Sequence, residues 1–436
     1  MKEKHALLEK FNLISGNFPH VIDLSLDRIL NLLSKMGNPH LNLPPIIHVA
    51  GTNGKGSTIQ FIASILKAAG KTLHIYTSPH LVTINERLIV SNNQVTDEQL
   101  SNALDFCLKI KQSDSITQFE LLTCMSFYIM AKNTADFAII ETGLGGRLDA
   151  TNVHPEPILT IITPISYDHE QFLGNSIKNI AKEKAGIIKE GVKCVSSNQM
   201  RIVEKNLEAV ANKKNSKLLI CGRDWNYKKF NKDFKLYENK KDSLYSLPFM
   251  EGDHQIENAA LAIFSLKQIN SLKISKININ NGLLKARWHG RLEKLNKGYI
   301  KNLLPKDSEV WLDGGHNVAA AIAIKNWLKI NNKKNSKKKI IFICAFLKTK
   351  SVKKILKTLT SQIDKVIFVE MSNFDNFYSV KKLTEIANTL QIDNTNRSSI
   401  SDAFKSVEYF RTNKVIIFGS LYLIGEVKKI NDYAIC

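Results

Sequence analysis

A short glycine-rich segment, AGTNGKGST at residues 50–58, combines the residue types that bind phosphate. Its glycines allow successive backbone N–H groups to point at one anion, and Lys55 adds a positive charge. The usual phosphate loop has a further glycine where this chain has Val49, so the segment is either a plain glycine-rich turn or a variant loop. An apolar run before it and a helical pattern after it favour nucleotide binding, with the hydroxyl of Ser57 or Thr58 beside magnesium.

Other polar side chains follow apolar runs, and their types suit a metal site. Glu141 ends the run ADFAIIE, where a carboxylate beside a phosphate loop suits magnesium; a helix-capping acid is the alternative. Ser78 and His169 end what we expect to be neighbouring strands, although a lone histidine is more often a core or surface residue. Lys184, in AKEKAGII, has the pattern of an exposed helix lysine.

The second half of the chain holds three weaker candidates. Arg291 has the side chain to grip a phosphate, and Asp313 ends an apolar run at GGHN. Asn258 lies in a helical pattern, HQIENAALA. Spacing alone assigns a function to none of them.

These side chains need a scaffold, and the pattern between them predicts a parallel sheet wrapped by helices. Apolar runs that end in polar turns alternate with stretches of helical periodicity, as in α/β proteins. Ligands of such sheets bind at the carboxyl ends of the strands, where the polar clusters fall. The runs are PPIIHVAG (44–51), KTLHIYTSPH (71–80), ADFAIIETG (135–143) and PILTIITPISYDH (157–169).

The rest of the chain predicts a second, smaller α/β domain. Residues 216–250 contain short alternating runs, which predict an antiparallel excursion, and residues 255–269 have the periodicity of a helix. A new series of apolar runs begins near residue 309. We therefore expect an ATP-binding domain over residues 1–285 and a C-terminal Rossmann-like domain over residues 286–436.

Composition excludes several classes of protein. The chain has 436 residues, is 44% hydrophobic, and carries a formal net charge of +21. Its lysines are scattered, so we expect anionic small-molecule ligands and no nucleic acid. Its six cysteines form no CxxC pair, which argues against a zinc site or a disulfide framework. No apolar run reaches membrane-spanning length and no signal peptide is evident, so we expect a cytoplasmic protein and no membrane partner.

Taken together, the motifs resemble the folylpolyglutamate synthase/dihydrofolate synthase family of the Mur ligase superfamily. The resemblance runs through most of the chain, and ordered motifs are far more specific than any single one. Gly-Thr-Asn-Gly-Lys-Gly-Ser is this family's form of the phosphate loop. The resembling motifs are AGTNGKGST, YTSPHL with INERL, FELLT, ETGLGGRLDATNV, DHEQFLG, KEKAGI, HQIENAALA, WHGRLE, LDGGHN and GSLYLIGEV.

The resemblance implies a reaction. A carboxylate attacks the γ-phosphate of ATP, and the amine of L-glutamate then attacks the resulting acyl phosphate. With dihydropteroate the product is dihydrofolate, and with a reduced folate it is a γ-linked glutamate chain. Whether one chain performs both steps stays open, and we expect a monomer.

The resemblance also assigns residues. It implies that Lys184 is carbamylated and that Lys55, His169 and Lys184 are catalytic. Two Mg²⁺ ions, with K⁺ as a further candidate, are expected at Ser57, Ser78, Glu141, His169 and Lys184. ATP is expected at Asn53, Gly54, Lys55, Gly56, Ser57, Thr58, Asn258, Arg291, Asp313 and His316. The pterin substrate is expected at Asp23, Leu24, Ser25, Leu26, Thr117, Gln118, Phe119 and Leu148.

Three alternatives remain. A Mur-type ligase for another acid shares the fold, but about 45 residues precede the phosphate loop, too few for the extra domain of peptidoglycan ligases. A phosphate-loop ATPase acting on nucleic acid would have no need of GLGGRLDATNV or DGGHN. An inactive homologue used as a binding module is disfavoured because Lys55, Glu141, His169 and Lys184 are all retained.

Overall fold

The computed structural model describes residues 25–112, 114–238, 241–332, 338–407 and 413–433. The chain divides into two compact units, Met1–Pro248 with Ile256–Ala286, and Phe249–Gln255 with Arg287–Cys436. Each unit contains a mainly parallel sheet flanked by helices, which confirms the expected α/β class. The sequence did not indicate that residues 249–255 group with the second unit. The boundary expected at 285/286 stays a prediction about independently folding domains.

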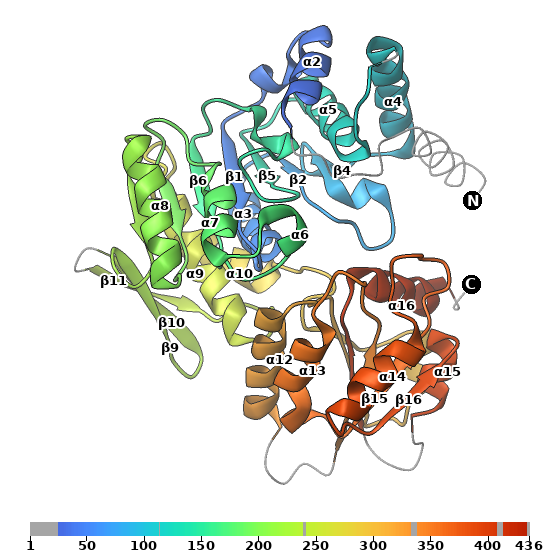
Figure 1. Ribbon diagram of the computed structural model, residues 1–436. Coiled ribbons are helices and arrows are strands. Elements are labelled where there is room, and N and C mark those ends of the chain that lie inside the picture. Colours follow the sequence, from blue (N-terminus) through green and yellow to red (C-terminus); the bar gives the residue numbers. More distant parts are fainter. Residues whose placement is uncertain (1–24, 113, 239–240, 333–337, 408–412, 434–436) are drawn as a thin grey trace. The chain divides into compact units, whose positions relative to one another are not determined.

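An eight-stranded sheet forms the centre of the first unit, in the order β4-β3-β2-β5-β1-β6-β7-β8 (Figure 1). Neighbours from β2 to β8 are parallel, whereas β3 pairs antiparallel with both β2 and β4. Each apolar run that ends in a polar turn contains one of these strands, as predicted. The bounds are β1 Ile46–Ala50, β2 Leu73–Tyr76, β3 Leu88–Val90, β4 Asn93–Gln94, β5 Phe137–Glu141, β6 Leu159–Ile162, β7 Cys194–Ser196 and β8 Leu218–Ile220.

Helices cover this sheet and bury its apolar side chains. The helices α2, α4 and α5 share one core with Ile46, Tyr76 and Ala138, and α7 and α8 share another with Ala50 and Ile162. The bounds are α2 Asp27–Lys35, α3 Lys55–Ala68, α4 Asp97–Lys111, α5 Gln118–Ala131, α6 Glu170–Leu173, α7 Ile177–Ala185, α8 Arg201–Lys213, α9 Asp253–Lys267 and α10 Lys276–Lys285, with 3₁₀ turns η1 Pro39–Asn42, η2 Ile84–Arg87 and η3 Ala150–Val153.

The excursion expected at residues 216–250 is divided between two sheets. The strands β9 (Trp225–Lys229), β10 (Asp233–Glu238) and β11 (Lys241–Ser246) form the predicted antiparallel sheet, and Trp225 stacks on Phe264 of α9 with ring centroids 4.7 Å apart. The prediction was wrong for β8, which pairs in parallel with β7. Periodicity does not assign so short an apolar run to a particular sheet.

The second unit contains a six-stranded sheet in the order β12-β13-β17-β14-β15-β16, in which only β12 is antiparallel to its neighbour. This arrangement confirms the second α/β series. The strands are β12 Glu293–Leu295, β13 Glu309–Asp313, β14 Lys339–Cys344, β15 Lys365–Val369, β16 Asn394–Arg397 and β17 Asn413–Phe418. The helices are α11 Tyr299–Asn302, α12 Val318–Asn331, α13 Val352–Leu359, α14 Val380–Thr389, α15 Ile400–Lys405 and α16 Leu421–Tyr433, with η4 at Thr360–Gln362.

Cysteines in the described parts of the chain are buried and free, as expected of structural thiols. Burial raises the pKa of the Cys107, Cys194 and Cys221 thiols to about 12, so these groups stay protonated at neutral pH. Cys436 lies outside the described residues. Within the same parts, no helix is both long enough and apolar enough to span a bilayer.

Candidate active site

The phosphate-loop segment runs from the end of β1 into the first turn of α3, and two of its glycines, Gly51 and Gly54, are sterically required. Gly51 and Gly54 have φ angles of 148° and 87°, which side chains rarely adopt. A Cβ at residue 54 would collide with Oδ1 of Asn258, and a Cβ at residue 51 would collide with Oγ1 of Thr163. The backbone of this turn is therefore fixed by contacts with two other segments of the first unit.

The first turn of α3 offers donors and hydroxyls for an anion. The N–H groups of Lys55, Gly56 and Ser57 have no carbonyl partner within the helix, and they lie at its positive end. The side chain of Ser57 is buried, and Oγ1 of Thr58 is buried with no hydrogen-bond partner among the described residues. A buried hydroxyl in this state fits a site that an oxygen ligand or a cation completes.

A second layer of contacts holds the loop against the segment that follows β6. The N–H groups of Thr52 and Asn53 donate to the Pro164 carbonyl oxygen at 3.0 and 3.3 Å, and Thr52 Oγ1 donates to the Ser166 carbonyl at 3.1 Å. Gln199 braces this segment, because its amide accepts from Ile165 N–H and donates to the Thr163 carbonyl. No local sequence pattern marks Gln199 as part of the site.

Glu141 lies directly beside the loop, as its position at a strand end predicts. The register of β1 with β5 pairs Val49 with Glu141. The Lys55 ammonium is 3.7 Å from Glu141 Oε1, and the Ser78 N–H donates to Glu141 Oε2 at 3.1 Å. The Glu141 side chain is 5% exposed, so a buried carboxylate, a lysine and the serine turn after β2 meet at one edge of the sheet.

Lys184 is a buried lysine at the same edge. Its amine donates to the Gly51 carbonyl oxygen at 2.8 Å, and the Lys55 amine donates to the same oxygen at 3.4 Å. Burial, followed by the nearby Lys55 charge, lowers the pKa of Lys184 to about 7. The exposed-lysine interpretation is thus wrong, because α7 turns Lys184 toward the phosphate loop. A substantial share of this amine is neutral near pH 7 and able to act as a nucleophile.

The donor set fits magnesium better than a transition metal. Within the described ranges, no three side chains among His, Cys, Asp and Glu gather as a metal site. Magnesium retains several waters and needs only one or two carboxylates beside substrate phosphates. Glu141 and the hydroxyls of Ser57 and Thr58 meet that requirement.

His169 lies in the loop after β6 rather than at the strand end. β6 ends at Ile162, and His169 precedes α6 with a left-handed backbone of φ 53°. The expectation that Ser78 and His169 end neighbouring strands is wrong, because β5 and β1 separate β2 from β6. Chain order does not reveal strand order in a sheet of this kind.

The residues expected at the pterin substrate fall on two adjoining helix starts and one loop. Ser25 and Leu26 immediately precede α2, and Thr117, Gln118 and Phe119 begin α5, which packs on α2. Leu148 is half-buried in the loop after β5. Asp23 and Leu24 lie outside the described residues.

Two carboxylates that the sequence analysis did not single out shape the neighbouring loops. Glu86 accepts the N–H groups of Leu81, Val82 and Thr83 at 2.7–2.8 Å, which fixes the loop after Ser78. The T-x-x-E spacing of a capping box signals this contact. Asp149, next to Leu148, accepts from the Leu144 and Thr151 N–H groups, and burial raises its pKa.

Three of the predicted ATP residues belong to the second unit. Asp313 ends β13 and joins two loops, because its carboxylate accepts from Leu292 N–H at 2.9 Å and Gly315 N–H at 2.8 Å. The His316 ring lies 2.9 Å from the Gly314 carbonyl oxygen. Arg291 immediately precedes the Leu292 contact. Asn258 belongs to the first unit, against Gly54.

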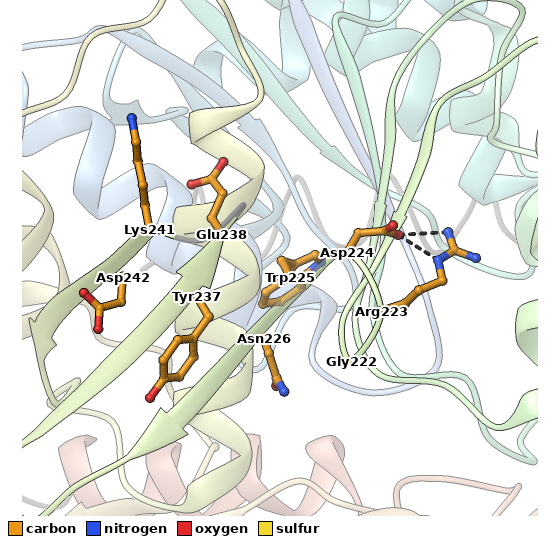
Figure 2. Close-up of a pocket in the computed structure, with 9 residues that line it drawn as sticks. All are labelled: Gly222, Arg223, Asp224, Trp225, Asn226, Tyr237, Glu238, Lys241 and Asp242. Atoms are coloured by element: carbon orange, nitrogen blue, oxygen red, sulfur yellow. Dashed lines mark hydrogen bonds and ion pairs between the residues drawn. The ribbon is translucent and has the colours of Figure 1, made fainter.

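A cavity of 330 Å³ lies elsewhere in the first unit, on the three-stranded sheet. Figure 2 shows Arg223 paired with Asp224 at one end of it and Lys241 and Asp242 at the other. Its lining includes none of the residues predicted to bind ATP, metal or substrate. Its charges are of both signs and already paired in part, so it does not favour one ligand class.

A glycine-rich loop at the edge of a parallel sheet, followed by a second α/β unit, is an arrangement that Mur-type ligases share, and the comparisons identify the chain as one of them. Residues 49–266 match the Mur ligase middle domain, and residues 296–430 match the C-terminal domain of dihydrofolate synthetase. The chain belongs to the dihydrofolate synthase/folylpolyglutamate synthase family, the ATP-dependent glutamate ligases of folate metabolism. The Bacillus subtilis dihydrofolate synthase/folylpolyglutamate synthase is 33% identical to it, over 95% of this chain and 97% of that protein.

Solved structures agree with this assignment. E. coli FolC in complex with DHPP and ADP has a TM-score of 0.88 and 25% identity, and the match covers 99% of this chain and 98% of that one. A bifunctional folylpolyglutamate synthase/dihydrofolate synthase with Mn, AMPPNP and L-glutamate bound has a TM-score of 0.82 and 25% identity, over 93% of this chain and 94% of that one. Relatives of this chain therefore bind adenine nucleotide together with a divalent metal.

Proposed function

We propose that this protein joins L-glutamate to dihydropteroate, to the γ-carboxyl of a reduced folate, or to both, using ATP. The observation that carries the proposal is the connected set at one sheet edge. Gly51 accepts from Lys55 and Lys184, Lys55 contacts Glu141, and Glu141 accepts from the Ser78 turn. A phosphate loop, a buried acid and a lysine of lowered pKa in mutual contact suit phosphoryl transfer to a carboxylate.

In the first half of the proposed reaction, a substrate carboxylate oxygen attacks the γ-phosphorus of ATP and the bond to ADP breaks. The N–H groups at the start of α3 and the Lys55 ammonium hold the phosphates and offset their charge. Bound magnesium, held by Ser57, Ser78, Glu141 and His169, would neutralise further phosphate charge. The product of this step is an acyl phosphate.

In the second half, the glutamate amine attacks the acyl carbon, loses a proton, and phosphate leaves with the electron pair of the broken C–O bond. Lys184 supports this step if it carries a carbamate. The nitrogen of a neutral amine forms a bond to the carbon of CO₂ and releases a proton, which gives an anionic carbamate whose oxygens can bind a cation. The pKa of about 7 for Lys184 makes the neutral amine accessible. We propose this group as a ligand for a second metal ion.

The remaining predicted roles extend the proposal. Asn258, Arg291, Asp313 and His316 are proposed to bind ATP, and the segments at residues 25–26 and 117–119 with Leu148 to bind the pteridine end of the substrate. A monomeric state, a cytoplasmic location and a role for K⁺ stay predictions.

The test is incorporation of labelled glutamate by the purified chain, dependent on ATP and Mg²⁺, with dihydropteroate and tetrahydrofolate in parallel. Incorporation with both substrates supports a bifunctional enzyme, and incorporation with one fixes a single activity. Incorporation with neither, by folded protein that binds ATP, would retire the folate substrates. Glu141→Gln is the matched control, because it preserves side-chain size and should abolish turnover without changing the unfolding temperature by more than a few degrees.

A further inference from the structure

Arg28 of α2 and Glu120 of α5 form a two-point ion pair. Arg28 Nε is 3.1 Å from Glu120 Oε2, and Arg28 Nη2 is 2.9 Å from Glu120 Oε1. The Glu120 side chain is 5% exposed and that of Arg28 is 21% exposed. Because a two-point contact holds the guanidinium and the carboxylate in one plane, it restricts the relative orientation of the two side chains as well as their distance.

Glu120 also fixes the first turn of its own helix. Its carboxylate accepts the Thr117 N–H at 2.7 Å, and Thr117 Oγ1 accepts the Glu120 N–H at 3.2 Å, which completes a capping box. Phe119 lies so close to Gly143 that a Cβ there would collide with its ring. One carboxylate therefore joins α2 to the start of α5, the helix turn that also carries Phe119.

We propose that Arg28 and Glu120 are a positioning pair for the pteridine end of the substrate. This inference rests on the proposed function. Arg28 follows Ser25 and Leu26 by one turn or less, and Glu120 follows the segment 117–119, so the ion pair joins the two chain segments assigned to the pteridine. Neither charged side chain needs to touch the ligand, because the pair sets the spacing between the groups that do.

Removing one partner would act through the other. Without Arg28, the Glu120 carboxylate would be nearly excluded from water and would lack its charged partner. Its movement toward other donors would disturb the capping box that it forms with Thr117. Small displacements of binding groups weaken a pre-formed site strongly, whereas the phosphate loop lies on a different element and keeps its own contacts. Loss of the ion pair should therefore weaken binding of the pteridine substrate and leave the binding of ATP unchanged.

The chain contains a matched control pair between the same two regions. Lys35, at the last turn of α2, is 2.6 Å from Asp114, which lies just before α5. Both side chains are more exposed than those of Arg28 and Glu120, at 42% and 32%, and neither adjoins a proposed binding residue. An exposed pair of this kind contributes little to stability and should leave substrate binding unchanged.

The experiment compares Arg28→Met, Arg28→Lys, Glu120→Gln and the control Lys35→Met in the full-length chain. Calorimetry measures the Kd of dihydropteroate and of ATP, steady-state assays measure KM and kcat, and thermal unfolding reports stability. We expect Arg28→Met to raise the Kd and KM for the pteridine substrate about tenfold, with ATP within about twofold. The Kd and KM of Arg28→Lys for the pteridine substrate should lie between those of the wild type and Arg28→Met, because lysine retains the charge but not the two-point geometry.

Equal weakening of ATP and pteridine binding, or a lower unfolding temperature with unchanged pteridine affinity, would overturn the positioning role and leave a merely structural pair. If Arg28→Met does not fold, Arg28→Lys and Glu120→Gln carry the same comparison. Wild-type protein that binds dihydropteroate or tetrahydrofolate without incorporating glutamate into either would contradict the proposed function alone. Wild-type protein that binds neither pteridine substrate would overturn both.

Discussion

The two sheets of the first unit hold their polar side chains in different ways. At the loop edge of the eight-stranded sheet, Glu141 and Lys184 are buried and the Lys55 side chain is 16% exposed. Both lysines donate to the carbonyl oxygen of Gly51, a residue whose φ of 148° other residues rarely adopt. The three-stranded sheet has the 330 Å³ cavity, but Arg223 and Lys241 there are exposed. A catalytic site requires ionisable groups that a fixed backbone holds away from solvent, and a surface cavity lined by exposed charges does not meet that requirement.

The largest expected difference between these regions comes from removing one lysine in each. Lys55→Met should lower kcat about 1000-fold, because it removes a preorganised positive charge from the transferring phosphate. Lys241→Met, in the cavity of the three-stranded sheet, should change kcat less than about twofold. Steady-state glutamate incorporation measures both, with circular dichroism to verify folding. Comparable losses of kcat in the two variants would contradict the predicted difference between the two sheets and would indicate a role for the cavity in catalysis.

Lys184→Ala should lower the rate about 100-fold, and short carboxylic acids such as acetate should restore part of it by supplying the missing anionic oxygen. Because burial lowers the pKa of Lys184 to about 7, its carbamate should form as the pH rises through 7 and be lost below it. Carbon-13 NMR of protein equilibrated with labelled CO₂ detects the modification. Lys182→Ala, exposed on the same helix, is the control. Full activity in Lys184→Ala would reduce this lysine to a structural role.

Two glycines with nearly the same φ angle allow the cost of backbone strain to be measured separately from the cost of a steric collision. Gly54 has φ 87° and Gly222, at the cavity, has φ 89°. A Cβ at Gly222 meets only Asn198 Oδ1 at 3.9 Å, so Gly222→Ala should cost about 1 kcal/mol of unfolding free energy from backbone strain. Gly54→Ala adds the collision with Asn258 and should cost about 3 kcal/mol or more, with a loss of ATP affinity. Urea unfolding and ATP titration measure the two effects, and equal costs would mean that the loop tolerates displacement.

A further predicted effect concerns pH and the strand that precedes the loop. His48 of β1 is buried against Thr151 Oγ1, and burial, with Lys189 and His154 adding, lowers its pKa to about 3. The unfolded chain binds a proton at this residue near pH 6.5 and the folded chain does not, so stability falls as the pH drops from 6.5 toward 3. From pH 7 to 5 this group should remove at most about 2 kcal/mol. His48→Gln should flatten that part of the urea-unfolding profile, and an unchanged slope would show that other groups titrate there.

The parts of the site that local sequence predicts are those set by one segment. The glycine loop, Glu141 at its strand end and Asp313 at GGHN are each specified by a strand and the turn that follows it. The positions of these residues at strand ends follow from the local pattern alone, whereas a role for Asp313 was implied only by the family resemblance. The core strands were predictable for the same reason, since a buried parallel strand requires a continuous apolar run.

The parts that could not be predicted depend on partners far along the chain. The burial of Lys184 depends on how α7 packs against the loop, and the separation of Ser78 from His169 depends on strand order. Arg28 and Glu120 are 92 positions apart in the sequence. The apolar run of β8 is too short for its pattern to predict which sheet the strand joins. Periodicity describes which face of an element is apolar but not which neighbour covers that face.

The packing of α10 on α3 has a consequence for synthesis. A Cβ at Gly282 would collide with the backbone of Ile65, so α10 lies directly on the helix that begins at the phosphate loop, and Asn258 of α9 fills the space beside Gly54. The phosphate loop is synthesised early, whereas α9 and α10, which support it, are synthesised about two hundred residues later. A nascent chain lacking α9 and α10 would carry the nucleotide motif without the shape that binds nucleotide. Acquisition of ATP affinity by chains of increasing length would thus mark the moment when the first unit completes its fold.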